Sequence, residues 1–237
     1  MGGSRSLKFA RFAGPPQGNR GCQGRPKDIA NGIEADGLYL EADTVQFKKK
    51  RDPERFGQAK ADIAGLIAQA QAGDIELAYV DESGFTPQPP NRYAWTRPGE
   101  THAVTAKRAQ RLNVMGAMLS SGKFFMAPLW KSVNGLYFFA FLMAMMERVN
   151  KPLVVILDNA SIHTAKKLKP YWDLLAEQGM RFYFLPPYSP ELNRIEILWR
   201  KIKYEWLPFK SYSASELEQA IEEIGNGWGE KYTFTFF

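Results

Sequence analysis

Cysteine and histidine are almost absent from this chain of 237 residues. Cys22 is its one cysteine, and His102 and His163 are its two histidines. A single cysteine excludes an internal disulfide, and these three residues cannot supply the ligand set of a structural zinc site. The N-terminus also lacks the apolar stretch of a secretory signal peptide. We therefore expect a protein of a reducing cytoplasm.

No hydrophobic run in the sequence is long enough to span a membrane. The longest uncharged segment, residues 132–146, contains the apolar run LYFFAFLMAMM. A membrane-spanning helix needs about 20 apolar residues, and this segment is shorter and is followed directly by Glu147. The segment is predicted to be a buried core helix, and no membrane association is expected.

Acidic residues are missing from the beginning of the chain. Residues 1–27 contain no Asp or Glu, and their basic residues carry as much charge as the net +6 of the whole chain. These basic residues are Arg5, Lys8, Arg11, Arg20, Arg25 and Lys27. The segment is rich in glycine and proline without periodicity, which is typical of disorder. We predict that residues 1–50 form a basic arm or the remnant of a DNA-binding region, and that residues 51–237 form the packed domain.

Beyond residue 51 the sequence alternates between helical and extended patterns. Apolar residues recur at helical spacing within 52–73 and stop at Gly73, and two buried strands lead into Asp81 and Asp158. Other strands are expected at 93–95, 111–119, 123–128 and within 181–187, with a hairpin turn at 120–122. Further helices are expected at 134–148, 164–177, within 186–203 and at 214–224. This order predicts an α/β fold, a mixed sheet flanked by helices.

Three carboxylates have positions that suggest a site. Asp81 in VDESG and Asp158 in LDNAS each end an apolar strand, and Glu196 borders the apolar face of the helix that follows PPYSPELN. In open sheets, ligands gather at the carboxyl ends of parallel strands. If the two strands are neighbours, both aspartates face one crevice, and Glu196 can supply a third acid. His163, close to Asp158, is a secondary candidate for a base.

Each carboxylate also has a simpler structural explanation. Asp81 can start a turn at DESG, and Asp158 can cap the helix that follows it. Glu196 can complete a capping box with Asn193 as the N-cap, or it can pair with Arg200 one turn later. Taken one at a time, these explanations are at least as good as a functional role. The joint pattern is harder to dismiss.

A cluster of three carboxylates has a specific chemical use. Like charges repel unless a cation lies among them, and Mg²⁺ prefers oxygen ligands. Two such ions about 4 Å apart can clamp the attacking and leaving oxygens of a phosphodiester. The pattern therefore points to metal-dependent cleavage of a phosphodiester.

Four motifs resemble a known family. VDESGF, WTRPG, ILDNASIH and LPPYSPELNRIEILWRKIK are together similar to the catalytic domain of bacterial insertion-sequence transposases of the mariner-related DDE superfamily. The resemblance runs from about Arg51 to the C-terminus. It implies a ribonuclease H-like fold in which Asp81, Asp158 and Glu196 bind two Mg²⁺ ions, with Mn²⁺ able to replace them.

The chain departs from the family pattern in three places. Residues 159–195 make the spacing between Asp158 and Glu196 slightly longer than is usual. Arg194 stands where the family commonly has proline, which adds a positive charge near the site. Relatives carry a longer helix-turn-helix region ahead of the catalytic domain, and residues 1–50 contain no such pair of helices.

The resemblance implies a DNA transposase that performs phosphodiester hydrolysis and strand transfer at insertion-sequence ends. Its expected partners are double-stranded DNA, as terminal repeats and target, and a second copy of the chain assembled on that DNA, in the bacterial cytoplasm at the nucleoid. One alternative is a truncated, catalytically idle remnant that at most binds DNA non-specifically. Another is an unrelated hydrolase that uses Asp81 and Glu196 as an acid and base pair.

Basic and aromatic residues near the motifs are candidates for DNA contacts. Lys and Arg side chains would pair with phosphates, and a tryptophan could stack on a base. The DNA-binding candidates are Trp95, Arg97, Arg194, Arg200, Lys201 and Lys203, and Lys107 and Arg108 are further phosphate candidates.

Overall fold

The computed structural model describes residues 51–90, 110–160 and 169–235. The helices are α1 (Pro53–Ala72), α2 (Gly135–Met146), α4 (Lys169–Glu177), α5 (Ile195–Lys201) and α6 (Ala214–Asn226). The strands are β1 (Glu76–Phe85), β2 (Leu112–Leu119), β3 (Phe124–Leu129), β4 (Leu153–Leu157) and β5 (Met180–Phe184). A 3-10 turn, η3 (Pro190–Leu192), precedes α5, and a π-helix, η4 (Ile202–Trp206), continues it.

The strands form one mixed sheet in the order β3-β2-β1-β4-β5. β1, β2 and β3 are antiparallel neighbours joined in part by the predicted hairpin turn, and β1, β4 and β5 are parallel. The parallel pairs need crossovers, which α2 and α4 provide. The predicted α/β class, a mixed sheet flanked by helices, is confirmed.

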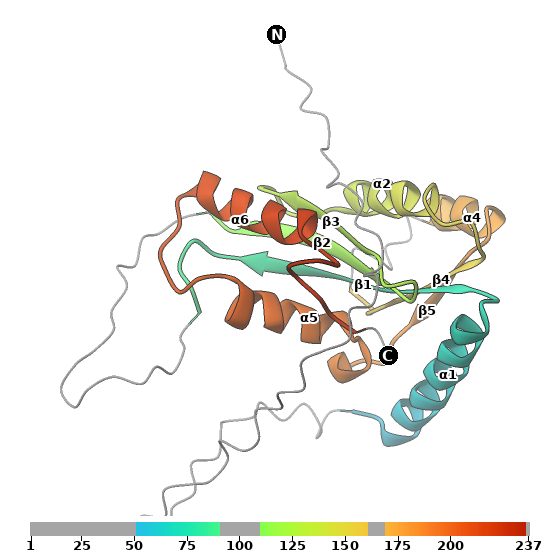
Figure 1. Cartoon of the computed structure of the whole chain (residues 1–237). Coiled ribbons are helices and arrows are strands. Elements are labelled where there is room, and N and C mark those ends of the chain that lie inside the picture. Colours follow the sequence, from blue (N-terminus) through green and yellow to red (C-terminus); the bar gives the residue numbers. More distant parts are fainter. Residues whose placement is uncertain (1–50, 91–109, 161–168, 236–237) are drawn as a thin grey trace, which may run out of the picture.

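The two faces of the sheet have separate cores. Leu77 and Tyr79 of β1 pack in a cluster with residues of α1, α5 and α6. Ala78 and Val80 pack in a second cluster with residues of α2 and α4. Figure 1 shows α2 and α5 on opposite sides of the sheet. Successive residues of a strand face opposite ways, so Asp81 shares the α5 face with Leu77 and Tyr79.

Helix α1 begins and ends as its sequence predicts. The Asp52 side chain accepts hydrogen bonds from the backbone amides of Glu54 and Arg55, and Gly73 ends the helix with a φ of 86°. Glycine adopts this left-handed conformation without a Cβ clash. The Tyr183 hydroxyl donates to Asp62 at 2.9 Å and ties α1 to β5.

The apolar segment at 132–146 forms the buried helix α2. The Asn134 side chain caps it by accepting from two backbone amides, and Phe138, Phe141, Leu142 and Met145 are buried. These side chains cover the sheet face opposite α5. In the part of the chain that the structure describes, no helix combines the length and the apolar character needed to cross a bilayer.

The chain after β5 forms the helix predicted within 186–203, but the end of this helix has π geometry. The turn η3 comes first, then the seven residues of α5, and then the π-helix η4. Three prolines at 186, 187 and 190 keep the beginning of this segment out of a helix. Beyond η4, α6 starts with a capping box in which Ser213 and Glu216 bond to each other's backbone amides.

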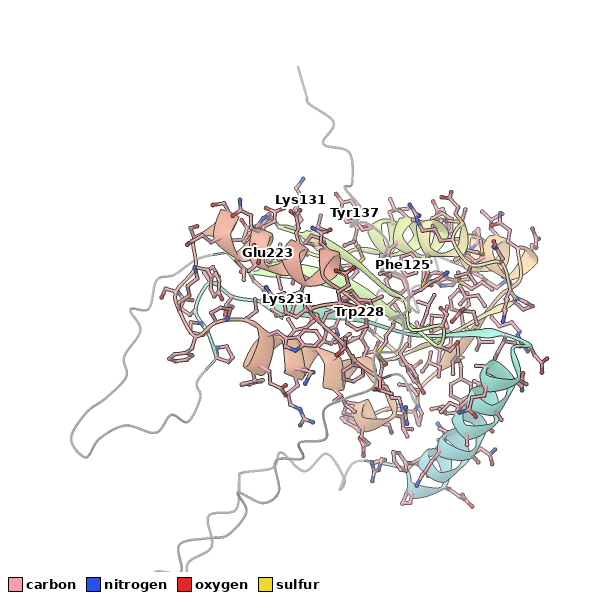
Figure 2. The ribbon with its side chains drawn as sticks, in the orientation of Figure 1. Phe125, Lys131, Tyr137, Glu223, Trp228 and Lys231 are labelled. Carbon is pink, nitrogen blue, oxygen red and sulfur yellow. The ribbon has the colours of Figure 1, made fainter. Side chains whose placement is uncertain are left out.

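The C-terminal segment closes the α5 side of the molecule. The indole of Trp228, labelled in Figure 2, donates to the carbonyl of Gly122 at 2.8 Å. Its ring also packs against Phe124 of β3, with 4.7 Å between the ring centroids. Trp228 therefore anchors the residues after α6 to the β2–β3 hairpin.

Several predictions have a different outcome or lie outside the described residues. Strand β1 does not end at Asp81 but continues to Phe85, because β2 pairs with it along that whole length. The DESG turn is therefore wrong. The predicted strand at 93–95, the first residues of the helix at 164–177 and the arm at 1–50 lie outside the described residues.

Candidate active site

The sheet places Asp81 and Asp158 side by side. β1 and β4 run parallel, and the last pair in their register is Tyr79 with Ile156. Each aspartate lies two residues beyond that pair, and an advance of two residues returns a side chain to the same face of a strand. The two carboxylates therefore lie at the same level and face the same side.

Asp158 is held by a local turn at the end of β4. Its Oδ1 accepts a hydrogen bond from the backbone amide of Ala160 at 3.0 Å. The side chain of Asn159 donates to the carbonyl of Leu185, which ties this turn to the residues after β5. The helix start that Asp158 was predicted to cap, and His163 with it, lie outside the described residues.

Glu196 comes to the site on the first turn of α5. The Asn193 side chain donates to the carbonyl of Val80 at 3.1 Å, so the chain just before α5 is fixed to the residue that precedes Asp81. The predicted capping box is wrong, because the side-chain oxygen of Asn193, which would have to accept from a backbone amide, has no hydrogen-bond partner among the described residues, and α5 has no side-chain cap. Among the described residues, Glu196 and Arg200 form no ion pair, so the second structural explanation for Glu196 is also wrong.

All three carboxylates line one open pocket of about 380 Å³. Asp81 is half-buried at its base, whereas Asp158 and Glu196 are exposed. The remaining wall comes from the turn after β4 and from the proline-rich segment after β5. These lining residues are Asn159, Ala160, Leu185, Pro186, Pro187, Tyr188, Ser189, Pro190 and Asn193.

The surroundings of Asp81 disfavour its ionised form and raise its pKa. Burial first, then the charge of Glu196, and less strongly the charge of Asp158 raise the pKa of Asp81 from 3.8 to about 7, against a lowering contribution from the backbone amide of Glu82. Near neutral pH, a substantial fraction of Asp81 therefore holds a proton in the absence of a cation.

Glu196 and Lys203 influence each other across the rim of the pocket. Partial burial raises the pKa of Glu196, the positive charge of Lys203 lowers it, and Asp158 raises it again. Burial lowers the pKa of Lys203, as does the charge of Arg111, while Glu196 and Asp81 oppose this change. Lys203 therefore supplies positive charge to the acidic pocket.

Trp199 also reaches the site, which the sequence analysis did not anticipate. Its indole nitrogen donates to Oδ2 of Asp81 at 3.0 Å. In the sequence Trp199 belongs to the apolar stripe of α5, and that role is confirmed because the residue is 2% exposed. The available signal is its spacing, since Trp199 follows Glu196 by three residues and so lies next to it on the surface of the helix.

The chemistry of the pocket suits a hard divalent cation. Its donors are carboxylate oxygens, and the side-chain oxygen of Asn193 is buried beside them without a hydrogen-bond partner in the described part of the chain. The raised pKa of Asp81 means that a cation would relieve an unfavourable concentration of charge. As the side chains are placed in the described ranges, no three His, Cys, Asp or Glu groups converge closely enough to hold one ion.

The predicted DNA contacts on α5 and η4 differ in accessibility. Arg200 is exposed, and Arg194 is half-buried at the start of α5. Lys201 pairs with Glu205 and lies over the ring of Trp206, 5.7 Å from its centroid. Arg200 is therefore the member of this set best placed to meet a phosphate from solvent.

Lys203, another candidate DNA contact, lies partly inside the structure. It is half-buried in η4, with its ammonium 5.2 Å from the ring centroid of Phe85. Its charge acts on Glu196 and Asp81 rather than being fully solvated. The other candidates, Trp95, Arg97, Lys107 and Arg108, lie outside the described residues.

Known proteins are similar to this chain over the region that contains the three carboxylates. The family described as "DDE superfamily endonuclease" matches residues 76–218, which include every strand and α5. A curated relative, "Uncharacterized protein y4pE/y4sA" of Sinorhizobium fredii (strain NBRC 101917 / NGR234), is 40% identical over 62 residues. That match covers 25% of this chain and 42% of the relative, so the chain spans less than half of its length.

Solved structures of a transposase have the same fold. The Mos1 paired-end complex with left transposon end matches with a TM-score of 0.53 and 17% identity, over 82% of this chain and 59% of that one. The Mos1 Strand Transfer Complex matches with a TM-score of 0.54 and 15% identity, over 84% of this chain and 61% of that one. The mixed sheet and its helices are thus ribonuclease H-like, and the chain spans about three-fifths of the Mos1 chains.

Proposed function

The chain belongs to the DDE superfamily endonuclease family, and from this premise we propose that it is a DNA transposase. Its reaction is metal-dependent hydrolysis of phosphodiesters and strand transfer at the ends of an insertion sequence. Asp81, Asp158 and Glu196 are its catalytic, metal-binding residues. The observation that carries this proposal is that these three acids, far apart in the sequence, line one pocket.

The three carboxylates would hold two divalent ions, Mg²⁺ or Mn²⁺ in its place. When bound, such ions supply Lewis-acid activation of the attacking oxygen and stabilise charge at the scissile phosphate. Asp81 is the least exposed of the three and must lose its proton to become a ligand, while Glu196 reaches the pocket from the first turn of α5. Lys203 offsets negative charge at the rim, which favours the approach of a phosphate backbone.

The proposed substrate is double-stranded DNA, both as the terminal repeats of the element and as the target. The similar Mos1 structures include a paired-end complex with the left transposon end and a strand transfer complex. Other similar Mos1 structures are described as paired-end complexes with Mn and with Mg. By analogy, we propose that two copies of this chain assemble on DNA and that it works at the bacterial nucleoid.

The surface beside the pocket supports DNA binding. Arg194 and Arg200 lie at the two ends of α5, the helix that carries Glu196. Arg200 is exposed and follows Glu196 by four residues, so a phosphate backbone lying against this face of α5 would meet its guanidinium group near the carboxylates. The contacts carry no base specificity, so recognition of the terminal repeat would require other residues.

A nicking assay with chelator control tests the proposal. The full chain is incubated with supercoiled plasmid carrying the element's ends, with Mn²⁺, with Mg²⁺ or with EDTA. We expect nicking that requires a divalent ion and falls by at least about 100-fold in Asp158→Asn and Glu196→Gln. The matched control is Glu191→Gln, a nearby acid of η3 that does not line the pocket.

The outcomes separate the candidate functions. Undiminished nicking by Asp158→Asn and Glu196→Gln would refute the assigned roles. Activity that persists in EDTA would favour a metal-independent hydrolase with Asp81 and Glu196 as acid and base. A folded wild-type protein that binds plasmid but never nicks it would identify an idle transposase remnant.

A further inference from the structure

The contact between Trp199 and Asp81 joins the two elements that carry the proposed ligands. Asp81 lies on β1, and Trp199 lies on α5, one turn after Glu196. The indole N–H donates to Oδ2 of Asp81 at 3.0 Å across 118 positions of sequence. A buried indole needs an acceptor for its one donor, and here that acceptor is a half-buried carboxylate.

Trp199 has little freedom to leave this carboxylate. Phe85 and Phe124 pack against its ring edge-to-face, each with 6.1 Å between ring centroids. On the sheet side, Gly116 pairs with Asp81 in the β1–β2 register. A Cβ on Gly116 would lie 2.4 Å from the Trp199 ring, so the ring occupies the space that the missing side chain leaves.

A second hydrogen bond holds the residues just before the same helix. The Asn193 amide donates to the carbonyl of Val80, directly before Asp81. Glu196 lies midway between Asn193 and Trp199, three positions from each. The position of Glu196 relative to Asp81 is thus set by two hydrogen bonds to β1, one from α5 and one from the residues just before it.

We propose that Trp199 is a positioning residue for Asp81 that holds Oδ2 in place and so orients the carboxylate toward a divalent ion. This role rests on the proposed function, because it requires Asp81 to be a metal ligand. An indole N–H stabilises an ionised carboxylate without adding charge, and it also restricts the side chain to one orientation. Hydrogen-bond partners of metal ligands commonly alter metal affinity by about 10-fold to 100-fold.

The test measures Mn²⁺ affinity instead of activity. Free Mn²⁺ is followed by its electron paramagnetic resonance signal as the full chain is titrated at constant pH. Trp199→Phe keeps an aromatic ring but has no N–H, and we expect its Mn²⁺ affinity to fall by about tenfold. Asp81→Asn, run beside it, is expected to reduce affinity at least as much.

Trp228→Phe is the matched control. Trp228 is 3% exposed, packs against the same Phe124, and donates its indole N–H to the carbonyl of Gly122, outside the pocket. Its substitution removes a buried indole hydrogen bond at comparable cost to folding. We expect its Mn²⁺ affinity to stay within about twofold of wild type, because the carboxylates are untouched.

A second variant at position 199 keeps the test valid if Trp199→Phe misfolds. Site-specific incorporation of 3-benzothienylalanine at position 199 replaces the N–H with sulfur and keeps the bicyclic shape, so the packing against Phe85 and Gly116 is preserved. We expect it to lower Mn²⁺ affinity like Trp199→Phe while leaving the thermal unfolding midpoint near that of wild type.

The outcomes distinguish this role from the proposed function. Wild-type Mn²⁺ affinity in the benzothienyl variant, or an equal loss in Trp228→Phe, would overturn the positioning role and leave the metal site intact. No Mn²⁺ binding by the wild-type chain, or binding that Asp81→Asn does not weaken, would overturn both. A loss confined to the two variants at position 199 and to Asp81→Asn would support both.

Discussion

Replacing Asp81 by asparagine should stabilise the metal-free protein at neutral pH. The pKa of Asp81 is about 7 in the folded chain, compared with 3.8 for an unperturbed aspartate, mainly because of burial and then because of Glu196. The folded state therefore holds a proton more tightly than the unfolded state does. The stability that comes from this proton is fully present below pH 3.8 and is lost as the pH rises through about 7.

The size of the effect follows from the two pKa values. At about 1.4 kcal/mol per pKa unit, the rise from 3.8 to about 7 corresponds to about 4 kcal/mol at pH 8, where both states are ionised. At pH 5 the folded state is still protonated, and the same relation leaves about 2 kcal/mol. Asparagine is neutral at both pH values and still offers an oxygen to the Trp199 indole, so Asp81→Asn should recover these amounts.

Urea denaturation in EDTA at pH 5 and pH 8 measures both values. The control is Asp173→Asn, an exposed carboxylate that pairs with Lys169 on α4, and its free energy of unfolding should change by less than about 0.5 kcal/mol at either pH. Addition of Mn²⁺ at pH 8 should stabilise the wild type and not Asp81→Asn. A destabilised Asp81→Asn protein at pH 8, or a gain that is the same at both pH values, would refute the reasoning.

Three further predictions concern packing, capping and DNA contact. Gly116→Ala should lower the free energy of unfolding by about 1–3 kcal/mol, because its Cβ would overlap the Trp199 ring, and urea denaturation indistinguishable from wild type would contradict this packing. Ser213→Ala removes one half of the capping box of α6 and should cost about 1 kcal/mol, measured by thermal unfolding, with an unchanged midpoint as the contrary result. Arg200→Ala should leave stability unchanged but weaken DNA binding, and the slope of the logarithm of the binding constant against the logarithm of the salt concentration should fall by about one. Fluorescence anisotropy with labelled DNA at several salt concentrations measures this slope, and an unaltered slope would show that Arg200 does not contact a phosphate.

The main elements of the fold could be predicted because their signals are local. The periodicity of α1 and its stop at Gly73, the uncharged helix α2 and the apolar strand β4 all appear where short-range patterns place them. These features depend on residues a few positions apart, which one sequence contains in full. The length of β1 was misjudged because DESG has turn composition, and pairing with β2 overrides this local preference.

For the candidate site, the sequence by itself singled out Asp81, Asp158 and Glu196, since strand ends and helix edges are readable from pattern and motif. Only the tertiary structure decided that these acids share a pocket, that Asn193 binds β1 instead of capping α5, and that Trp199 donates to Asp81. The physical reason is that these contacts depend on which strands are neighbours, on their register and on the space left by Gly116. The hydrogen bonds of Asn193 and Trp199 join residues more than a hundred positions apart, and they form only once the chain has folded.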